Sequence, residues 1–151
     1  MESPEKLWYI RPFEDGDSDF VISTMLLANR YSPDSLAMQV HKDKEAQKRY
    51  WVGCERLVQR LVEKTEVRVA EAIGPEGTKL IVGWVMGESD VICHYILSRR
   101  SFQKMGIAKD LLTPFLQAEG QVLYSFRPAT KGIKIPEGWK YDSYCAWKWM
   151  K

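Results

Sequence analysis

The sequence predicts an α/β fold with a central mixed β-sheet flanked by helices. A nearly continuous apolar run from Val91 to Leu97 is typical of a strand buried on both faces. It is followed by apolar residues spaced three and four apart from Ile107 to Leu116, which indicates a helix, and then by a second strand-like run, Gln121–Phe126. A helical crossover of this kind joins parallel strands, whereas the earlier strands follow one another closely and favour antiparallel pairing.

Length and composition set the broad class. The chain has 151 residues, of which 45% are hydrophobic and 28% charged, so one globular domain spanning residues 1–151 is expected. The net charge of +2 is too small to indicate a partner. Three separated cysteines and two histidines argue against a disulfide framework and a metal site, and favour a reducing compartment. With no signal peptide, lipidation motif or membrane-spanning run in the sequence, a cytoplasmic location without membrane attachment is expected.

The first half of the chain reads as one strand and two helices. Leu7–Phe13 is rich in β-formers, and Phe20–Tyr31 has a helical apolar face. Lys42–Lys64 is the clearest amphipathic helix. Its predicted buried stripe consists of Tyr50, Cys54, Leu57, Val58, Leu61 and Val62, and its predicted water-facing side consists of Lys48, Arg49, Glu55, Arg56, Arg60 and Glu63.

A hairpin and a final strand complete the predicted sheet. Glu66–Ile73 and Leu80–Gly87 are strand-like runs joined by a Gly-Pro-containing turn, the pattern of a hairpin. Gly87–Asp90 then turns into the strand at 91–97. Near the C-terminus, Trp139–Met150 alternates in polarity, which predicts a last strand.

The segment between the buried strand and the helix at 107–116 has the features of an anion site. Gly106 allows the backbone to approach a phosphate closely, and the first amides of a helix have no internal hydrogen-bond partner. These amides also carry the positive end of the helix dipole. The segment consists of Gln103, Lys104, Met105, Gly106, Ile107 and Ala108. An ordinary strand–turn–helix corner would give the same pattern.

This segment resembles the pyrophosphate-binding signature of the GCN5-related N-acetyltransferases, Gln/Arg-x-x-Gly-x-Gly/Ala. The expected order of elements across roughly residues 6–127 also resembles that family's fold. The resemblance implies acetyl-CoA as a co-substrate, with its pantetheine arm entering between two splayed parallel strands. Backbone groups of Ile96, Leu97 and Ser98 would then line the arm and polarise the thioester carbonyl, and residues 103–108 would hold the pyrophosphate.

Two features depart from the family's pattern. Pro114 lies inside the crossover helix, where it removes a backbone hydrogen bond and should kink or shorten that helix. The family also places a fourth helix after the next strand, often with a tyrosine that acts as general acid. Residues 127–138 here read as loop and turn, so the C-terminal half is abbreviated.

Acyl transfer to an amine needs a base, an oxyanion stabiliser and a proton donor for the thiolate. His94 is the first candidate base because imidazole titrates near neutral pH. Asp90, with Glu88 in the same bend, could act through water. Tyr124 is a candidate acid, with Tyr144 and Tyr141 behind it. For each of these residues the alternative is an ordinary core or turn position.

The sequence therefore predicts an N-acetyltransferase that moves an acetyl group directly from acetyl-CoA to an amine. The acceptor is unknown and could be a small molecule, a protein or a nucleobase; the oligomeric state is also unknown. One alternative is a degenerate binding module of the same fold for nucleic acid or protein, favoured by the missing helix and by the basic, tryptophan-rich tail. Another is an acyltransferase that modifies nucleic acid.

Overall fold

A six-stranded mixed sheet forms the centre of the molecule, as predicted. The computed structural model describes residues 7–30, 43–102, 105–126 and 135–150. The strands lie in sequence order, as β1 (Trp8–Pro12), β2 (Glu66–Ile73), β3 (Lys79–Glu88), β4 (Ile92–Ser98), β5 (Leu123–Tyr124) and β6 (Lys140–Tyr141). Strands β1 to β4 are antiparallel neighbours, whereas β4, β5 and β6 pair in parallel.

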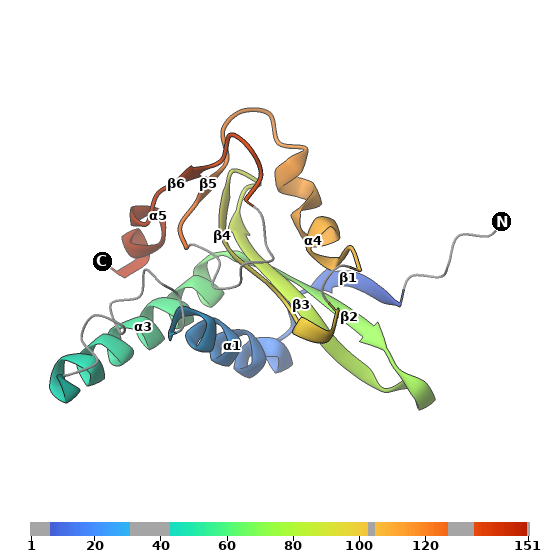
Figure 1. Cartoon of the computed structure of the whole chain (residues 1–151), viewed down its shortest axis with the longest axis horizontal. Coiled ribbons are helices and arrows are strands. Elements are labelled where there is room, and N and C mark those ends of the chain that lie inside the picture. The colour runs from blue at the N-terminus through green and yellow to red at the C-terminus, as the bar shows by residue number, and fades with distance from the viewer. Residues whose placement is uncertain (1–6, 31–42, 103–104, 127–134, 151) are drawn as a thin grey trace.

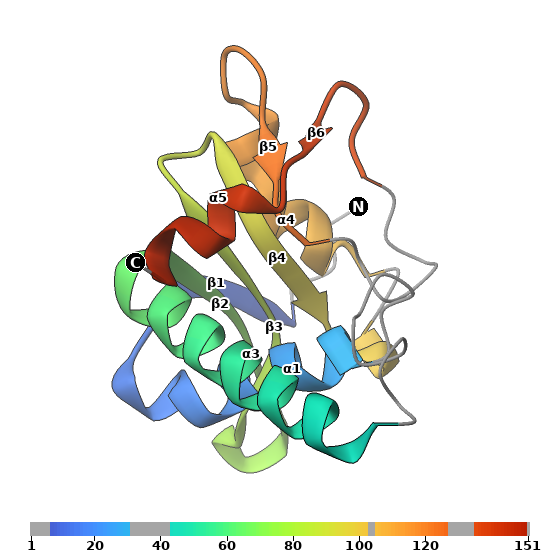
Figure 2. The ribbon, with the colours of Figure 1, turned by 90° about the vertical axis from the view of Figure 1, so that its left-hand side faces the viewer.

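Helices cover both faces of this sheet (Figures 1 and 2). Helices α1 (Ser18–Arg30) and α3 (Lys44–Lys64) lie on one face, together with the short C-terminal helix α5 (Tyr144–Trp147). Helix α4 (Ile107–Leu116) lies on the other. Single 3-10 turns complete the described elements: η1 (Asp15–Asp17), η2 (Pro75–Gly77), η3 (Arg100–Phe102) and η4 (Lys148–Met150).

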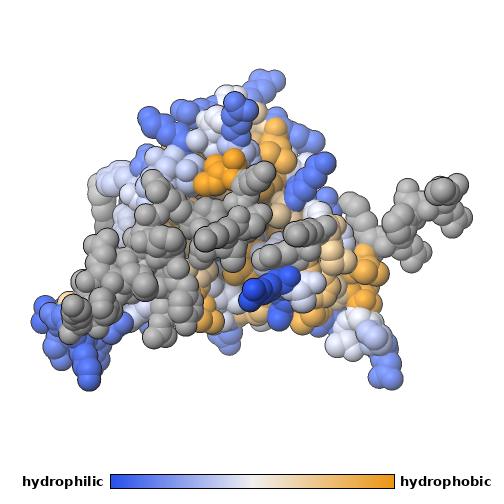
Figure 3. All heavy atoms as spheres, in the orientation of Figure 1, coloured by the Kyte–Doolittle hydropathy of each residue, from blue (hydrophilic) through white to orange (hydrophobic). Residues whose placement is uncertain are grey.

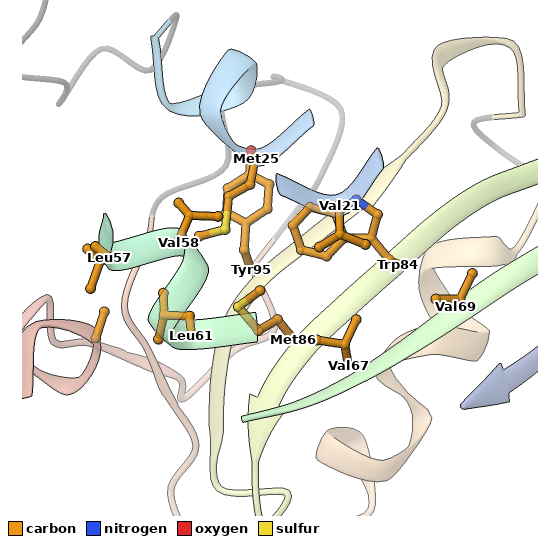
Figure 4. Close-up of a cluster of buried hydrophobic side chains, with 11 residues drawn as sticks. Val21, Met25, Leu57, Val58, Leu61, Val67, Val69, Trp84, Met86 and Tyr95 are labelled. Atoms are coloured by element: carbon orange, nitrogen blue, oxygen red, sulfur yellow. The ribbon is translucent and has the colours of Figure 1, made fainter. Parts of the chain in front are cut away.

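The predicted stripe of α3 packs against α1 and the sheet (Figure 4). Cys54, Leu57, Val58 and Leu61 are buried, Tyr50 and Val62 are half-buried, and the six predicted water-facing residues are exposed. Asp43 caps the helix by accepting hydrogen bonds of 3.1 Å from the backbone N–H groups of Glu45 and Ala46. The opposing side chains of α1 and the sheet are Val21, Met25, Val67, Val69, Trp84, Met86 and Tyr95.

Helix α4 packs closely on β3 because two positions of that strand are glycine. A Cβ built on Gly83 would come within 3.1 Å of Ile107 and 3.2 Å of Leu111 on α4, and one on Gly87 within 2.4 Å of the Phe115 ring. The glycines therefore let Phe115 and its neighbours lie directly on the backbone of β3. This contact fixes the position of α4 relative to β4.

A buried ion-pair cluster holds the edge strand β1 to the sheet. The Arg11 guanidinium donates to both carboxylate oxygens of Asp17, at 2.7 and 2.8 Å, and to Glu71 Oε2 at 3.0 and 2.8 Å. The Arg11 hydrogen bond lowers the pKa of Asp17, while hydrogen bonds from Tyr9 and Arg11 lower that of Glu71. Outside this cluster, hydrophobic side chains gather at the start of β1, where Leu7 is 58% exposed (Figure 3).

Two sequence-based expectations about the second half need correction. Trp139–Met150 does not form one strand: a two-residue β6 is followed by α5 and η4. Cys145 and Ala146 are adjacent and both buried, which a strand with one covered face does not allow, and Asp142 accepts a hydrogen bond of 3.0 Å from the Tyr144 N–H at the start of α5. Strand β5 is also shorter than the predicted 121–126.

We expect Gly87→Ala to lower the free energy of unfolding by about 1–3 kcal/mol, because the added methyl overpacks the contact with Phe115. Gly53→Ala is the matched control. A Cβ on Gly53 meets nothing within 4 Å inside α3, so this change should stabilise the protein by up to about 1 kcal/mol. Urea unfolding measures both values, and equal effects of the two substitutions would contradict the close packing of α4 on β3.

Candidate active site

Strands β4 and β5 part after only two residue pairs. Ile92 is paired with Leu123 and Cys93 with Tyr124, and the ladder between these strands ends there. The rest of β4, residues 94–98, forms no ladder pair with the described residues that follow β5. Over residues 94–98, β4 therefore has no strand partner on this side among the residues that the structure describes.

A β-bulge lies where the two strands part. On its other side β4 pairs with β3, and the register passes from Met86↔Tyr95 to Gly87↔Cys93. This shift leaves His94 without an opposing residue. A bulge bends its strand and redirects the side chain at that position. The register therefore explains why His94 points towards β5 and the C-terminal segment.

A small cavity lies between the parting strands, with a volume of about 30 Å³. Its walls come from both faces of the sheet, since Ile96 belongs to the core beneath α4 and Tyr95 to the core beneath α1 and α3. The remaining lining residues are Cys93, His94, Leu112, Tyr124, Phe126, Ile135, Pro136 and Trp139. Apart from His94 and the two tyrosines, the lining side chains are therefore mainly apolar.

His94 forms a buried hydrogen-bond network with side chains from three other segments. Its Nδ1 lies 2.6 Å from Ser125 Oγ, and its Nε2 contacts Glu88 Oε2. Glu88 also forms an ion pair of 3.0 Å through Oε1 with Lys148, and Trp149 Nε1 donates to its Oε2 at 3.5 Å. The imidazole is fully buried, so both of its nitrogens are occupied by protein groups.

Burial keeps this imidazole neutral. Desolvation lowers the pKa of His94, and the neighbouring Glu88 offsets this only in part. Burial alone would raise the pKa of Glu88, but its hydrogen bonds with Lys148 and His94 outweigh that effect and the pKa is lowered. Since a carboxylate only accepts hydrogen bonds, the proton of the neutral ring is on Nε2. Nδ1 is then the acceptor, and the Ser125 hydroxyl donates to it.

The predicted anion site begins at a left-handed glycine. Gly106 has φ 95° and ψ 4° and forms the N-cap of α4, where none of the described side chains caps the helix. Asp110, in the first turn, accepts a hydrogen bond of 3.0 Å from Trp8 Nε1. Met105 is exposed, Ile107 is buried and Ala108 is half-buried beside it; Gln103 and Lys104 lie outside the described residues.

The remaining predicted residues on β4 border the parted strands. Ile96 lines the cavity, and Leu97 packs into the core on the side of α1 and α3. Ser98 Oγ is buried and makes no hydrogen bond with any described group. An unsatisfied buried hydroxyl is costly and indicates a place for a further polar group.

Of the other catalytic candidates, Tyr124 lines the cavity, whereas Asp90 and Tyr144 do not. Tyr124 contacts Tyr141, with 5.4 Å between the ring centroids and the ring planes tilted by 51°. Asp90 lies in the turn before β4 and forms an ion pair of 3.2 Å with Arg68. Tyr144, at the start of α5, is 61% exposed and is not among the cavity residues.

Sequence reasoning missed two members of the network, Ser125 and Lys148. A lone serine inside the apolar run Gln121–Phe126 was the available signal for Ser125. The ion pair of Lys148 with Glu88 depends on the fold of the C-terminal segment, which was predicted as a strand.

The chain is similar to a known protein in its structure, whereas two comparisons of its sequence find no match. No protein-family model and no curated protein match the chain. The structure is similar to that of a GCN5-related N-acetyltransferase. That protein, from Rhodopseudomonas palustris and described as "Aminotransferase, Class-II", has a TM-score of 0.49 and 10% identity, with 78% of this chain and 68% of that chain covered. A likeness at this level says nothing about activity.

The residues that the structure describes contain no group of three or more metal-ligating side chains. None of their helices is both long and apolar enough to cross a membrane.

The lowered pKa of His94 predicts a pH dependence of stability. The unfolded chain binds a proton at this histidine near pH 6.5, whereas the folded protein binds it only at lower pH. Stability should therefore fall as pH drops from about 6.5 towards the folded pKa. His94→Gln should cost about 1–3 kcal/mol at pH 7.5 through lost buried hydrogen bonds, and should flatten the slope between pH 7.5 and 5.5. Urea unfolding at both values tests this, and an unchanged slope in the variant would contradict it.

Proposed function

We propose that this protein is an N-acyltransferase that transfers the acyl group of an acyl-CoA, with acetyl-CoA as the expected donor, directly to an amine. The observation that carries the proposal is the parting of β4 from β5 after two residue pairs. Beyond these pairs, residues 94–98 have no ladder partner among the described residues that follow β5, beside a cavity and on the strand that leads to the start of α4. A pantetheine arm contains two amides, which can pair with such an edge as a strand would.

The residues along this path suit an acyl-CoA. The buried hydroxyl of Ser98 supplies a polar partner for the arm. The left-handed Gly106 and the uncapped first turn of α4 supply backbone donors for a pyrophosphate. Because the cavity is only about 30 Å³, binding requires its wall to move, and Trp139 is a large half-buried part of that wall.

The chemistry asked of the protein is modest because a thioester is already activated. The backbone N–H groups of β4 near the bulge at His94 would polarise the thioester carbonyl, and the neutral imidazole would take up the proton of the attacking amine. Tyr124, which also lines the cavity, is the candidate donor of a proton to the departing thiolate. The acceptor amine remains to be identified.

A non-catalytic binding module is the second candidate. Tyr144 and Trp147, three residues apart on α5, are 61% and 44% exposed and could stack on unpaired bases. The other tail tryptophans do not contribute equally, since Trp139 lines the cavity and Trp149 contacts Glu88. We therefore favour the enzyme.

We expect Gly106→Val to weaken CoA binding by more than about tenfold, because a side chain at the N-cap of α4 blocks close approach of phosphate. Gly120→Val is the matched control. Gly120 has φ 96°, close to the 95° of Gly106, so both changes carry similar backbone strain, and a Cβ on Gly120 meets nothing within 4 Å. Calorimetric titration with CoA gives the affinities, and circular dichroism checks the fold. Equal affinities for the two variants would contradict the phosphate role.

Tryptophan fluorescence distinguishes the two candidate functions. Saturable quenching by acetyl-CoA, reduced by Trp139→Phe, is the expected result for the transferase. Quenching by single-stranded DNA alone, removed by Trp147→Ala and unaffected by Trp139→Phe, would instead support the binding module. A response to both ligands would support an acyltransferase that modifies nucleic acid.

A further inference from the structure

We propose that a second copy of this chain pairs with the open edge of β1, in an antiparallel arrangement about a twofold axis at Tyr9. Strand β1 is the first strand of the sheet, and β2 is its one ladder partner among the described residues. The sheets of the two copies would continue into one another across the axis, through the same surface on both copies. This assembly does not depend on the function proposed above.

The outer edge of β1 presents the backbone groups of Trp8 and Ile10. The Phe13 N–H donates to the backbone of β2 at 3.2 Å, so this residue belongs to a hydrogen-bonded pair of the β1–β2 ladder. Such pairs alternate along an antiparallel ladder. Tyr9 and Arg11 therefore also bond to β2, whereas Trp8 and Ile10 direct their N–H and C=O groups away from it. Within the described ranges, no backbone hydrogen bond from another segment occupies these outward groups.

The residue at the end of the strand selects one register. Pro12 has no N–H, and its carbonyl accepts a hydrogen bond of 3.0 Å from Arg11 Nη1. An axis at Ile10 would place Trp8 opposite this proline, and an axis at Trp8 would form two backbone hydrogen bonds between described residues. An axis at Tyr9 places Trp8 of each copy opposite Ile10 of the other. It forms four backbone hydrogen bonds, two for each of these pairs.

The same register brings together side chains that are exposed in the single chain. Tyr9 is 38% and Ile10 37% exposed, and Leu7 extends the apolar surface at the start of β1 (Figure 3). On one face, Tyr9 would lie opposite Tyr9 of the second copy, and aromatic cross-strand pairs of this kind are stabilising. On the other face, Ile10 would cover the half-buried indole of Trp8 of the second copy. Because β1 matches itself in this way, a second copy is the partner that the edge fits.

The edge lacks the charged side chains that protect many exposed strands from pairing. Lysines and other charges on an edge strand usually prevent such contacts. Within the segment Leu7–Pro12, Arg11 is the one charged residue, and it forms ion pairs with Asp17 at 2.7 Å and with Glu71 at 2.8 Å. Its charge is therefore balanced inside its own subunit. Two copies can approach along β1 without opposing like charges.

Strand β1 is held in place before any pairing. The ion pairs of Arg11 fix it on one face, and on the other Trp8 Nε1 donates to Asp110 of α4 at 3.0 Å. A preorganised edge loses little conformational entropy when it pairs. The contact is small because β1 has five residues, and small interfaces are at the weak end of the range. We therefore expect a dimer with a Kd in the micromolar range.

Sedimentation velocity of the full chain, over concentrations that span the micromolar range, measures the association. Ile10→Lys places a charge on the edge and should raise the dimer Kd by more than about tenfold. Ile10→Pro removes an outward N–H without removing a bond to β2, and should also weaken the dimer. The matched control is Val52→Lys, since Val52 is an apolar residue of α3 that is 46% exposed. This control should leave the Kd within about twofold of wild type. Thermal unfolding checks that each variant is folded.

Amide hydrogen exchange followed by NMR gives a readout at single residues. The amides of Tyr9 and Arg11 bond to β2, so they should be protected at every protein concentration. The amides of Trp8 and Ile10 should exchange rapidly in dilute protein and slow by more than about tenfold when the dimer forms. Val52→Lys should keep this concentration dependence, and in Ile10→Lys the Trp8 amide should lose it.

Each contrary outcome rejects the pairing. A chain that stays monomeric at the highest concentration overturns the proposal, and so does a dimer that Ile10→Lys leaves intact. A dimer weakened by Val52→Lys alone would place the interface on the helical face instead. Protection of Trp8 and Ile10 that does not change with concentration would show that the edge is already covered within one chain.

Discussion

The parting of β4 and β5 is the constraint on which the rest of the site depends. Backbone N–H and C=O groups that are buried in a sheet must find partners, so a strand that loses its neighbour midway needs another one. Here the separation coincides with the bulge at His94, which turns one side chain out of the regular alternation. The glycines of β3 add to this by letting α4 pack so closely that its first turn is held beside the end of β4.

The same region contains the most unusual buried chemistry in the described part of the chain. An imidazole without solvent contact is held between a serine and a carboxylate, and the carboxylate is held by a lysine from the last turn of the chain. The C-terminal segment thus covers the network and supplies its counter-charge. The network also places an imidazole of lowered pKa at the wall of a cavity.

Much of the fold could be predicted from periodicity, and the exceptions have physical causes. The stripe of α3 and the hairpin of β2 and β3 are local patterns, and both are confirmed. The alternation of residues 139–150 predicted a strand wrongly, because α5 is only four residues long and too short to show a helical period. Within the site, His94 was predicted as a candidate base because imidazole titrates near neutral pH. The structure shows the hydrogen-bond partners of its two ring nitrogens. Ser125 and Lys148 are brought to the network by tertiary contacts that no local pattern encodes.

Amide hydrogen exchange on β4 tests the central claim most directly. The protein would be followed by NMR alone, with CoA, and with adenosine 3′,5′-bisphosphate, which lacks the pantetheine arm. If the arm lies along the parted edge, CoA should slow exchange of backbone amides within residues 94–98, and the bisphosphate should leave them unchanged. Slowed exchange with CoA that is confined to other strands or helices would contradict the account.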